Sequence, residues 1–339
     1  MRAIILALLA FLALTVPTMA AVAETVIFLA HSNINDPNDN PTAAMAMTFK
    51  ERVEARSDGA LRVEIFPENQ LGTDAKTVEL VRKGIIQMAI SSVSGITPLY
   101  PLMAVMDYPF AYRRVEEAYT VLDGPFGQRL RTDIEAKAGV AVLGFGDTGG
   151  LFVLTNSRRP VRSPADLVGL RIRTMNAEAH RLLVSSMGGE PVTIGWNHVF
   201  GALQTGLADG QMNSISTTRY GRLHAVQKYM TLTNHVYVPF LWTANPAFMA
   251  GLGDRQRTII ADAVAEGVRA SRTLAITASD QQLSALLPSV RIHHPTEAEL
   301  TAFRDATQPP MREFVERSFG AEGRRLLDDF LAAVKQAQR

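Results

Sequence analysis

Apolar and polar positions alternate along the first half of the chain in a pattern typical of strands followed by helices. Short apolar segments rich in β-branched residues predict strands at residues 25–30, 61–66, 86–91 and 140–143. The polar periodicity between them predicts helices at about residues 41–57, 74–83, 114–122 and 127–138. Because such alternation builds parallel strand pairs covered by helices, this half predicts a mostly parallel α/β sheet with both faces covered.

The second half repeats this style without repeating the sequence. Strands are predicted at residues 151–155, 170–174, 229–238 and 291–292, and helices at about 178–187 and 197–205. From residue 254 to about 287 the helical pattern continues almost without a breaker, and the C-terminal remainder is helical and amphipathic. A helix that long exceeds one small domain, and 339 residues suggest about two domains, so we expect the helix to span both.

The N-terminus has the features of a secretory signal. Arg2 precedes an apolar core at residues 3–16, and Ala21 and Ala23 form an A-x-A site before Glu24. The core is too short for a comfortable membrane span, so we expect cleavage after Ala23 and export to the periplasm. The chain contains no cysteine, which excludes a lipoprotein anchor, a disulfide framework and thiolate chemistry.

Composition and charge narrow the class of partner. Hydrophobic residues make up 47% of the chain and charged residues 20%, which are ordinary values for a globular protein. The formal net charge is +1, and loss of Arg2 with the signal reduces it to zero. We therefore expect no basic field that could hold nucleic acid or an anionic membrane, and no nucleic-acid partner.

The segment from residue 166 to 213 carries the candidate chemistry. Arg171 and Arg173 lie two apart on a predicted strand that leads to Asn176, and a second predicted strand delivers Gln211 and Asn213. A guanidinium can hold both oxygens of a carboxylate in one plane, and nearby amides can satisfy the remaining lone pairs. The alternative is that both arginines are solvated or that one of them pairs with Asp166. The pattern predicts capture of a small carboxylate without chemistry.

The other motifs favour structural roles over catalysis or cofactor binding. Residues 144–149 match GxGxxG after a strand, but the next residues predict another strand instead of the helix that a dinucleotide site needs, so a flexible crossover fits better. The chain has no GxSxG elbow, HExxH or EF-hand loop, and its histidines are scattered. We therefore expect no catalytic residue, no cofactor and no metal, and an exported enzyme is a less favoured alternative. Trp196 and Trp242, the only tryptophans, are candidates for core packing or for an aromatic wall over a ligand.

Four ordered blocks resemble one known family. FPENQLG followed by VELVRKGIIQMA, and then PADLVGLRIR, FGALQTGLADGQMN and VQKYMTLTNH, are similar to the blocks of DctP-type solute-binding proteins of TRAP (tripartite ATP-independent periplasmic) transporters. The resemblance covers nearly the whole exported chain. It implies a protein, expected to be a monomer, that captures an organic acid and hands it to membrane permease subunits driven by an ion gradient.

The family also implies an α/β fold of two domains that close like a clam shell, as in periplasmic binding proteins, with a long helix spanning both domains. The expected division is a signal at 1–23, domain I at 24–150 and 239–278, and domain II at 151–238 and 279–339. We expect closure to bend the crossovers near Gly149-Gly150 and Pro239.

The resemblance also implies the ligand site. The arginine that clamps the ligand carboxylate corresponds to Arg173, and two amides and an aromatic residue accompany it on domain II. The implied set is Arg173, Asn176, Asn213 and Trp196, with His31, Asp74 and Ser92 at positions of domain I that line the cleft.

The chain departs from the family pattern at two points. Many relatives carry a second cleft arginine where this chain has Leu151-Phe152-Val153, and many have glutamate where this chain has His198. Without the second arginine a buried second carboxylate would lack a cationic partner. We therefore expect a monocarboxylate with an apolar or aromatic body, walled by Phe152 and Trp196. A binding module that signals to a membrane receptor remains an alternative.

Overall fold

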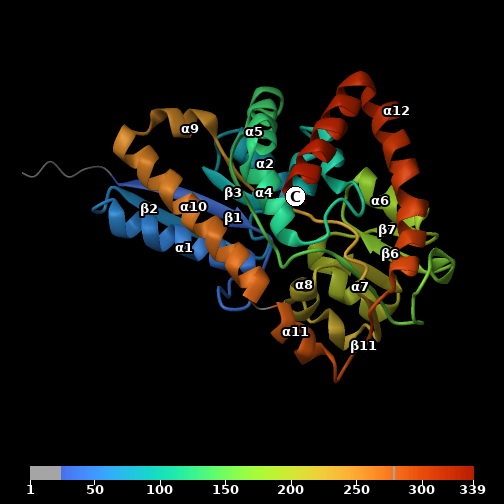
Figure 1. Ribbon diagram of the computed structural model, residues 1–339. Helices are drawn as coiled ribbons and strands as arrows, with labels where there is room; N and C mark the ends of the chain where they lie inside the picture. The colour runs from blue at the N-terminus through green and yellow to red at the C-terminus, as the bar shows by residue number, and fades with distance from the viewer. Residues whose placement is uncertain (1–23, 278) are drawn as a thin grey trace, which may run out of the picture.

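The computed structural model describes residues 24–277 and 279–339, so the expected signal peptide lies outside the described part. Two mixed β-sheets, each covered by helices, lie side by side (Figure 1). The first sheet has the order β2-β1-β3-β10-β4 and the second β11-β9-β5-β8-β6-β7. This is the expected two-domain α/β architecture. No helix within the described ranges is long and apolar enough to cross a membrane.

The strand bounds follow the predicted apolar segments closely in the first half and less closely in the second. The first sheet comprises β1 (Thr25–His31), β2 (Leu61–Phe66), β3 (Met88–Ser91), β4 (Ala141–Gly146) and β10 (Phe240–Ala244). The second comprises β5 (Val153–Asn156), β6 (Arg171–Thr174), β7 (Glu190–Thr193), β8 (Gly210–Asn213), β9 (Tyr229–Thr231) and β11 (Arg291–His293).

The helices occupy the faces and ends of these sheets. In the first half they are α1 (Pro41–Arg56), α2 (Asp74–Arg82), α3 (Val93–Ile96), the 3-10 helix η1 (Pro101–Asp107), α4 (Val115–Asp123) and α5 (Pro125–Ala138). Next come η2 (Pro164–Leu167), α6 (Glu178–Ser186), η3 (Trp196–His198), α7 (Val199–Thr205), α8 (Ile215–Tyr220) and η4 (Leu223–Ala225). The last are α9 (Pro246–Gly251), α10 (Asp254–Thr277), α11 (Ser279–Leu286) and α12 (Glu297–Ala337).

The sheets are less parallel than expected because each contains a strand that enters from a crossover. β10 pairs antiparallel with both β3 and β4, and β5 pairs antiparallel with both β8 and β9. β10 was not predicted, because Pro239 and Pro246 flank it and suggested breakers. Trp242 of β10 is fully buried and packs on Phe49 of α1 at a ring distance of 4.7 Å, so it is a core residue.

The first crossover requires a glycine. Gly149 has φ +128, and a Cβ there would lie only 2.1 Å from Cβ of Ser216. The buried Asp147 fixes the turn, because its Oδ1 accepts hydrogen bonds of 2.7 Å from the backbone N–H groups of Gly149 and Gly150. The turn that links the two sheets is therefore a specific structure and not a loose linker.

The long helix that contacts both halves lies elsewhere than expected. The predicted helix at 254–287 forms two helices, and α10 packs against α1 and β4 of the first half. The C-terminal α12 contacts α6 in the second half and α4 and α5 in the first. Its direction changes at Gly320 (φ 58, ψ −143), which is visible as the bend at the top of Figure 1. The final turns of α12 thus lie on helices of the first half, although we predicted residues 279–339 to belong to domain II.

Candidate functional site

A cavity of about 180 Å³ lies between the two halves, where several parallel strands end. Ser32 follows β1, Ser92 follows β3, Asn176 follows β6 and Asn213 ends β8. Ligands of open α/β sheets bind outside the carboxyl ends of the strands, so the location fits a ligand site. Seven of the eight predicted ligand-binding residues line this cavity: Arg173, Asn176, Asn213, Trp196, Asp74, Ser92 and Phe152.

Arg173 supplies a positive charge to the second-half wall. Its side chain is almost fully buried, and its Nε donates a 2.9 Å hydrogen bond to the backbone oxygen of Ile194. Among the described residues it has no carboxylate within ion-pair distance. Burial lowers its pKa to about 10, and the charge of Asp74 partly opposes this shift. At neutral pH Arg173 is therefore a buried cation without a direct counter-ion.

Arg171 has a different role, although it is only two residues away on the same strand. Its Nε and a terminal nitrogen donate to the two carboxylate oxygens of Asp209 at 3.0 and 3.1 Å. A third bond from the guanidinium reaches the backbone oxygen of Gly206 at 2.6 Å. Arg171 therefore ties together the turn before β8, and it is not among the cavity-lining residues. Its acidic partner is Asp209 and not Asp166.

A chain of buried amides orients Asn213. Its Nδ2 donates to Oε1 of Gln211 at 2.7 Å, and Nε2 of Gln211 donates to Oγ1 of Thr155 at 2.8 Å. The Thr155 hydroxyl donates in turn to Gln227 at 3.0 Å. Because these bonds consume one amide hydrogen of Asn213, its oxygen and its other hydrogen remain for the cavity. Gln211, which does not line the cavity, therefore fixes the orientation of the Asn213 amide.

Asp74 forms the charged part of the first-half wall. Its Oδ2 accepts hydrogen bonds from the backbone N–H of Ser92 at 3.0 Å and from the Ser92 hydroxyl at 2.6 Å. Burial raises the pKa of Asp74, whereas the bonds from Ser92 and the charge of Arg173 act in the opposite direction. The carboxylate is thus held in place at the start of α2, facing the arginine across the cavity.

The aromatic walls have rigid supports. Phe152 is buried, and its ring lies edge-to-face with His180 at 6.5 Å. Trp196 meets Tyr220 edge-to-face at 6.1 Å and lies so close to Gly221 that a Cβ there would come within 2.9 Å of the indole. Met175, Ile194 and Phe240 add further apolar surface to the lining.

His31 is the predicted residue that is not among those lining the cavity. It has the same strand parity as Ile27 and Leu29, which belong to the core cluster with residues of α1 and α10, whereas Ser32 and Asn33 line the cavity. Both ring nitrogens of His31 are buried without a hydrogen-bond partner. Burial lowers its pKa to about 4, so it is neutral at pH 7.

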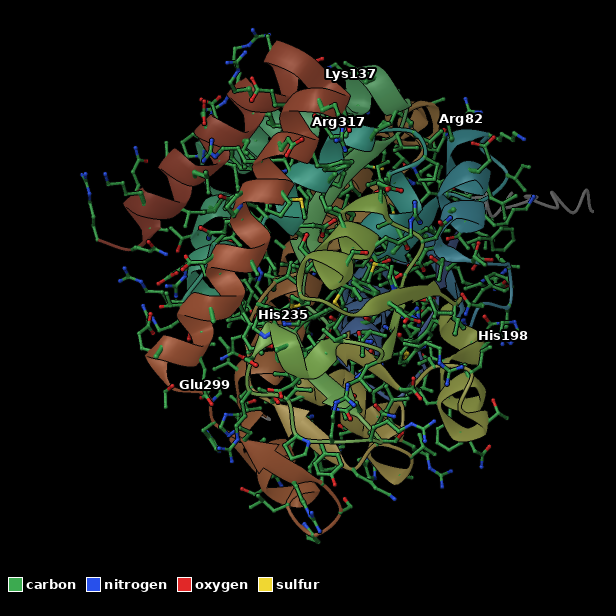
Figure 2. All side chains as sticks on the ribbon, turned by 90° about the vertical axis from the view of Figure 1, so that its right-hand side faces the viewer. Arg82, Lys137, His198, His235, Glu299 and Arg317 are labelled. Atoms are coloured by element: carbon green, nitrogen blue, oxygen red, sulfur yellow. The ribbon has the colours of Figure 1, made fainter. Side chains whose placement is uncertain are left out.

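Several polar lining residues were not predicted from the sequence. Ser32 and Asn33 lie directly after β1, a position that the strand-end rule could have identified. The others come from turns, from the short helices α3 and η3 and from α8, whose proximity to the cavity depends on the fold: Asn69, Thr73, Ser94, Thr148, Asn197, Thr217 and Tyr220. No group of His, Asp and Glu side chains suited to a metal ion occurs among the residues that the structure describes. His198 is exposed at the edge of the molecule, whereas His235 lies inside (Figure 2).

Comparison with known proteins places this geometry in a family. Residues 31–318 match the model of the DctP family, described as bacterial extracellular solute-binding protein, family 7. The chain is 31% identical over 329 residues to the C4-dicarboxylate-binding periplasmic protein DctP of Rhodobacter capsulatus, covering 96% of this chain and 94% of that protein.

Two solved structures share the fold over nearly their whole length. The sugar acid binding protein DctPAm of Advenella mimigardefordensis, in complex with galactonate, is similar with a TM-score of 0.86 and 27% identity, covering 93% of this chain and 99% of that one. A TRAP periplasmic solute binding protein of Shewanella oneidensis with bound succinate has a TM-score of 0.85 and 26% identity, covering 94% and 100%. Together with the family match, these findings show that the chain belongs to the DctP family of TRAP solute-binding proteins, which are transport proteins and not enzymes.

Proposed function

We propose that this protein captures a small monocarboxylate bearing hydroxyl groups and delivers it to the permease subunits of a TRAP transporter. The observation that carries the proposal is Arg173, a buried cation that lacks a carboxylate partner within the described part of the chain. A buried charge is costly unless it is paired, and a ligand carboxylate supplies the missing partner. Asn176 and Asn213 lie beside it as additional hydrogen-bonding groups.

The first-half wall, opposite Arg173, favours a ligand with one carboxylate over a ligand with two. Asp74 faces the cavity with its Oδ2 satisfied by Ser92, which leaves Oδ1 to accept a hydrogen bond from a ligand hydroxyl. A second ligand carboxylate near Asp74 would meet a like charge. Relatives of similar fold bind both kinds of acid, because one holds galactonate and another holds succinate. The acid on the first wall favours the galactonate type for this chain.

The lining modifies the expectation of an apolar or aromatic ligand body. Phe152, Trp196, Ile194, Met175 and Phe240 provide apolar surface, and most of the other lining residues carry hydroxyl or amide groups. A lining that mixes apolar surface with hydrogen-bonding groups fits a hydroxylated carbon chain, whose C–H and O–H groups can contact both kinds of surface. A purely aromatic body would leave many of these polar groups without partners.

A thermal-shift screen tests the proposal directly. The panel contains aldonates and uronates, aliphatic and aromatic monocarboxylates, and succinate. A ligand at a hundredfold excess over its Kd stabilises the folded state by about 2.7 kcal/mol, which is a measurable rise in melting temperature. We expect the largest rise for a hydroxylated monocarboxylate, and no rise for the same acid with Arg173→Lys. A largest rise with succinate would refute the preference for one carboxylate, and no rise with any acid would refute carboxylate capture.

A further inference from the structure

The rim of the second sheet farthest from the cavity is strongly basic. It is formed by the end of antiparallel β5 and the starts of β6, β8, β9 and β11, and we call it the basic rim. Hydrogen bonds join its segments, because Ser157 N–H donates to Asp209 O at 2.9 Å and Arg291 N–H donates to Lys228 O at 2.9 Å. Its basic side chains are Arg158, Arg159, Arg162, Arg171, Lys228 and Arg291.

Few carboxylates neutralise this rim. Asp209 is shared by Arg158 and Arg171, Asp166 caps η2, and Glu190 lies beside Arg171 in the strand register. Six basic side chains against three carboxylates leave a local charge of +3. The exported chain is neutral overall, so all its other residues together carry −3. The zero net charge therefore conceals a separation of charge that the fold creates.

Four of the six cations of the basic rim form no ion pair with Asp209 and can face a partner. The Arg159 guanidinium donates only to the backbone oxygens of Asp166 and Val168, which hold it in place without neutralising its charge. Arg162 and Lys228 are exposed, and Arg291 extends over the Tyr229 ring at 5.7 Å. This arrangement fixes several positive charges at the surface.

Two aliphatic side chains project from the same rim. Val168 is 61% exposed, and its own backbone oxygen accepts a hydrogen bond from Arg159. Leu207 is 56% exposed and follows Gly206, whose backbone oxygen accepts a hydrogen bond from Arg171. Large aliphatic side chains that protrude between fixed cations are typical of surfaces that touch a lipid interface, where charge attracts the headgroups and the apolar tips enter the acyl boundary.

We propose that the basic rim docks on the surface of an anionic phospholipid bilayer. The positive charges come from four separate segments of chain and spread along a sheet rim, which suits a plane of headgroups better than a single acidic peptide. The cavity opens at the opposite ends of the strands, so docking leaves ligand entry free. A binding protein held at the membrane has a raised effective concentration near a membrane permease.

Vesicle sedimentation tests this docking. Protein exported by the cell, with the loss of residues 1–23 checked by mass spectrometry, is mixed with phosphatidylcholine vesicles with or without phosphatidylglycerol. We expect binding only with phosphatidylglycerol at low salt, and weaker binding at about 0.15 M salt, where the Debye length is about 8 Å. Replacing four rim cations with glutamine (R159Q, R162Q, K228Q, R291Q) should weaken binding at least about tenfold.

A matched variant separates position from total charge. Four exposed cations of α12 are replaced in the same way (R317Q, R324Q, R325Q, K335Q), which changes the net charge equally at another place; Figure 2 labels Arg317 there. We expect this variant to bind vesicles like the wild type, and Val168→Ser with Leu207→Ser to bind about threefold more weakly. Unchanged melting temperatures confirm that the variants fold. The proposal fails if the wild type does not bind phosphatidylglycerol vesicles. It also fails if both four-site variants lose vesicle binding equally. Binding of an acidic peptide without binding of vesicles would refute it in favour of a protein partner.

Discussion

The two walls of the cavity both carry a charge, but the charges stand in opposite situations. On the second-half wall, Arg173 is almost fully buried and donates a hydrogen bond of 2.9 Å to the backbone oxygen of Ile194, and no carboxylate in the described part of the chain forms an ion pair with it. On the first-half wall, Asp74 already accepts two hydrogen bonds from Ser92. Arg173 therefore lacks a counter-ion when no ligand is bound, whereas Asp74 already has hydrogen-bond donors from its own half of the molecule.

This difference separates affinity from selectivity. A cation that has lost its water and lacks a counter-ion gains most when a carboxylate arrives, so Arg173 should dominate affinity. A carboxylate that is already held by its own domain gains less from a ligand, but it still repels a negative charge placed beside it. Asp74 should therefore decide which acids are accepted more than how tightly they bind.

The largest expected effect comes from removing the cation. Arg173→Met should weaken binding of the preferred acid by about a hundredfold or more, because charge-assisted hydrogen bonds contribute roughly 1.5–3 kcal/mol each. Without ligand the same variant should unfold at an equal or higher temperature, since a buried unpaired charge is lost. Calorimetry and thermal melts measure the two effects.

Arg171→Gln is the matched control for this substitution. It removes an equal charge two residues away, where the guanidinium binds Asp209 outside the cavity. Affinity should be nearly unchanged and thermal stability should fall. Comparable losses of affinity in both variants would mean that the second-half wall acts through its fold and not through a direct clamp.

The second expected effect is a loss of stability at low pH, because two buried histidines take up protons more readily in the unfolded chain than in the folded one. Burial lowers the pKa of His31 to about 4, and burial followed by the charge of His180 lowers the pKa of His235 to about 3. The unfolded chain takes up these protons near pH 6.5, before the folded chain does. Stability is therefore complete above about pH 6.5, and the free energy of unfolding should fall by up to about 1.4 kcal/mol per pH unit for each histidine as the pH drops toward 4.

Urea unfolding at several pH values between about 7 and 4.5 measures this slope. His31→Gln should make the slope shallower, because it removes one of the two buried histidines that take up a proton more readily in the unfolded chain. His198→Gln is the control, since it removes an exposed histidine and leaves both buried histidines in place (Figure 2). An equal slope in wild type and His31→Gln would show that His31 takes up its proton alike in both states.

The two walls also differ in how far the sequence predicted them. Arg173, Asn176 and Asn213 were identifiable because β6 and β8 are neighbouring parallel strands whose carboxyl ends meet, a rule that needs only strand positions. The first-half wall was predicted by family resemblance and less completely: Asp74 and Ser92 line the cavity, whereas His31, which has the strand parity of the core residues Ile27 and Leu29, is not among the lining residues.

Other features depend on contacts between distant segments. Phe240 reaches the cavity because β10 returns between β3 and β4, and no local pattern shows which strands will be its neighbours. The helix that bridges the halves is α12, whose second part bends at Gly320 toward α4 and α5. Periodicity predicted a helix there, but only the packing decides which half it covers.

The third prediction sharpens the selectivity of the first-half wall. Asp74→Asn removes the negative charge opposite Arg173 but keeps the shape of the side chain. The affinity for succinate relative to a matched hydroxylated monocarboxylate should rise by roughly tenfold, or about 1.4 kcal/mol. Competition calorimetry gives this ratio. Ser94→Ala, a neutral change on the same wall, should leave the ratio unaltered, and an unaltered ratio with Asp74→Asn would remove the aspartate as the selective group.

The smallest expected effect comes from an ion pair that joins the two halves outside the cavity. Arg219 of α8 binds Asp39 of the loop before α1, and both side chains are partly exposed, at 38% and 28%. Exposed ion pairs contribute about 0.2–1 kcal/mol.

Arg219→Gln should therefore raise the dissociation rate of the preferred acid by about two- to fivefold and change its association rate little, because one contact between the two halves is lost. Stopped-flow measurements at low and high salt resolve this, since salt should reduce the wild-type advantage. Arg181→Gln is the matched control, because Arg181 pairs with Glu178 inside α6 and joins no two halves. If both variants release ligand at the wild-type rate, the contact between Asp39 and Arg219 does not restrain opening, and the two charged walls alone determine how long the ligand stays.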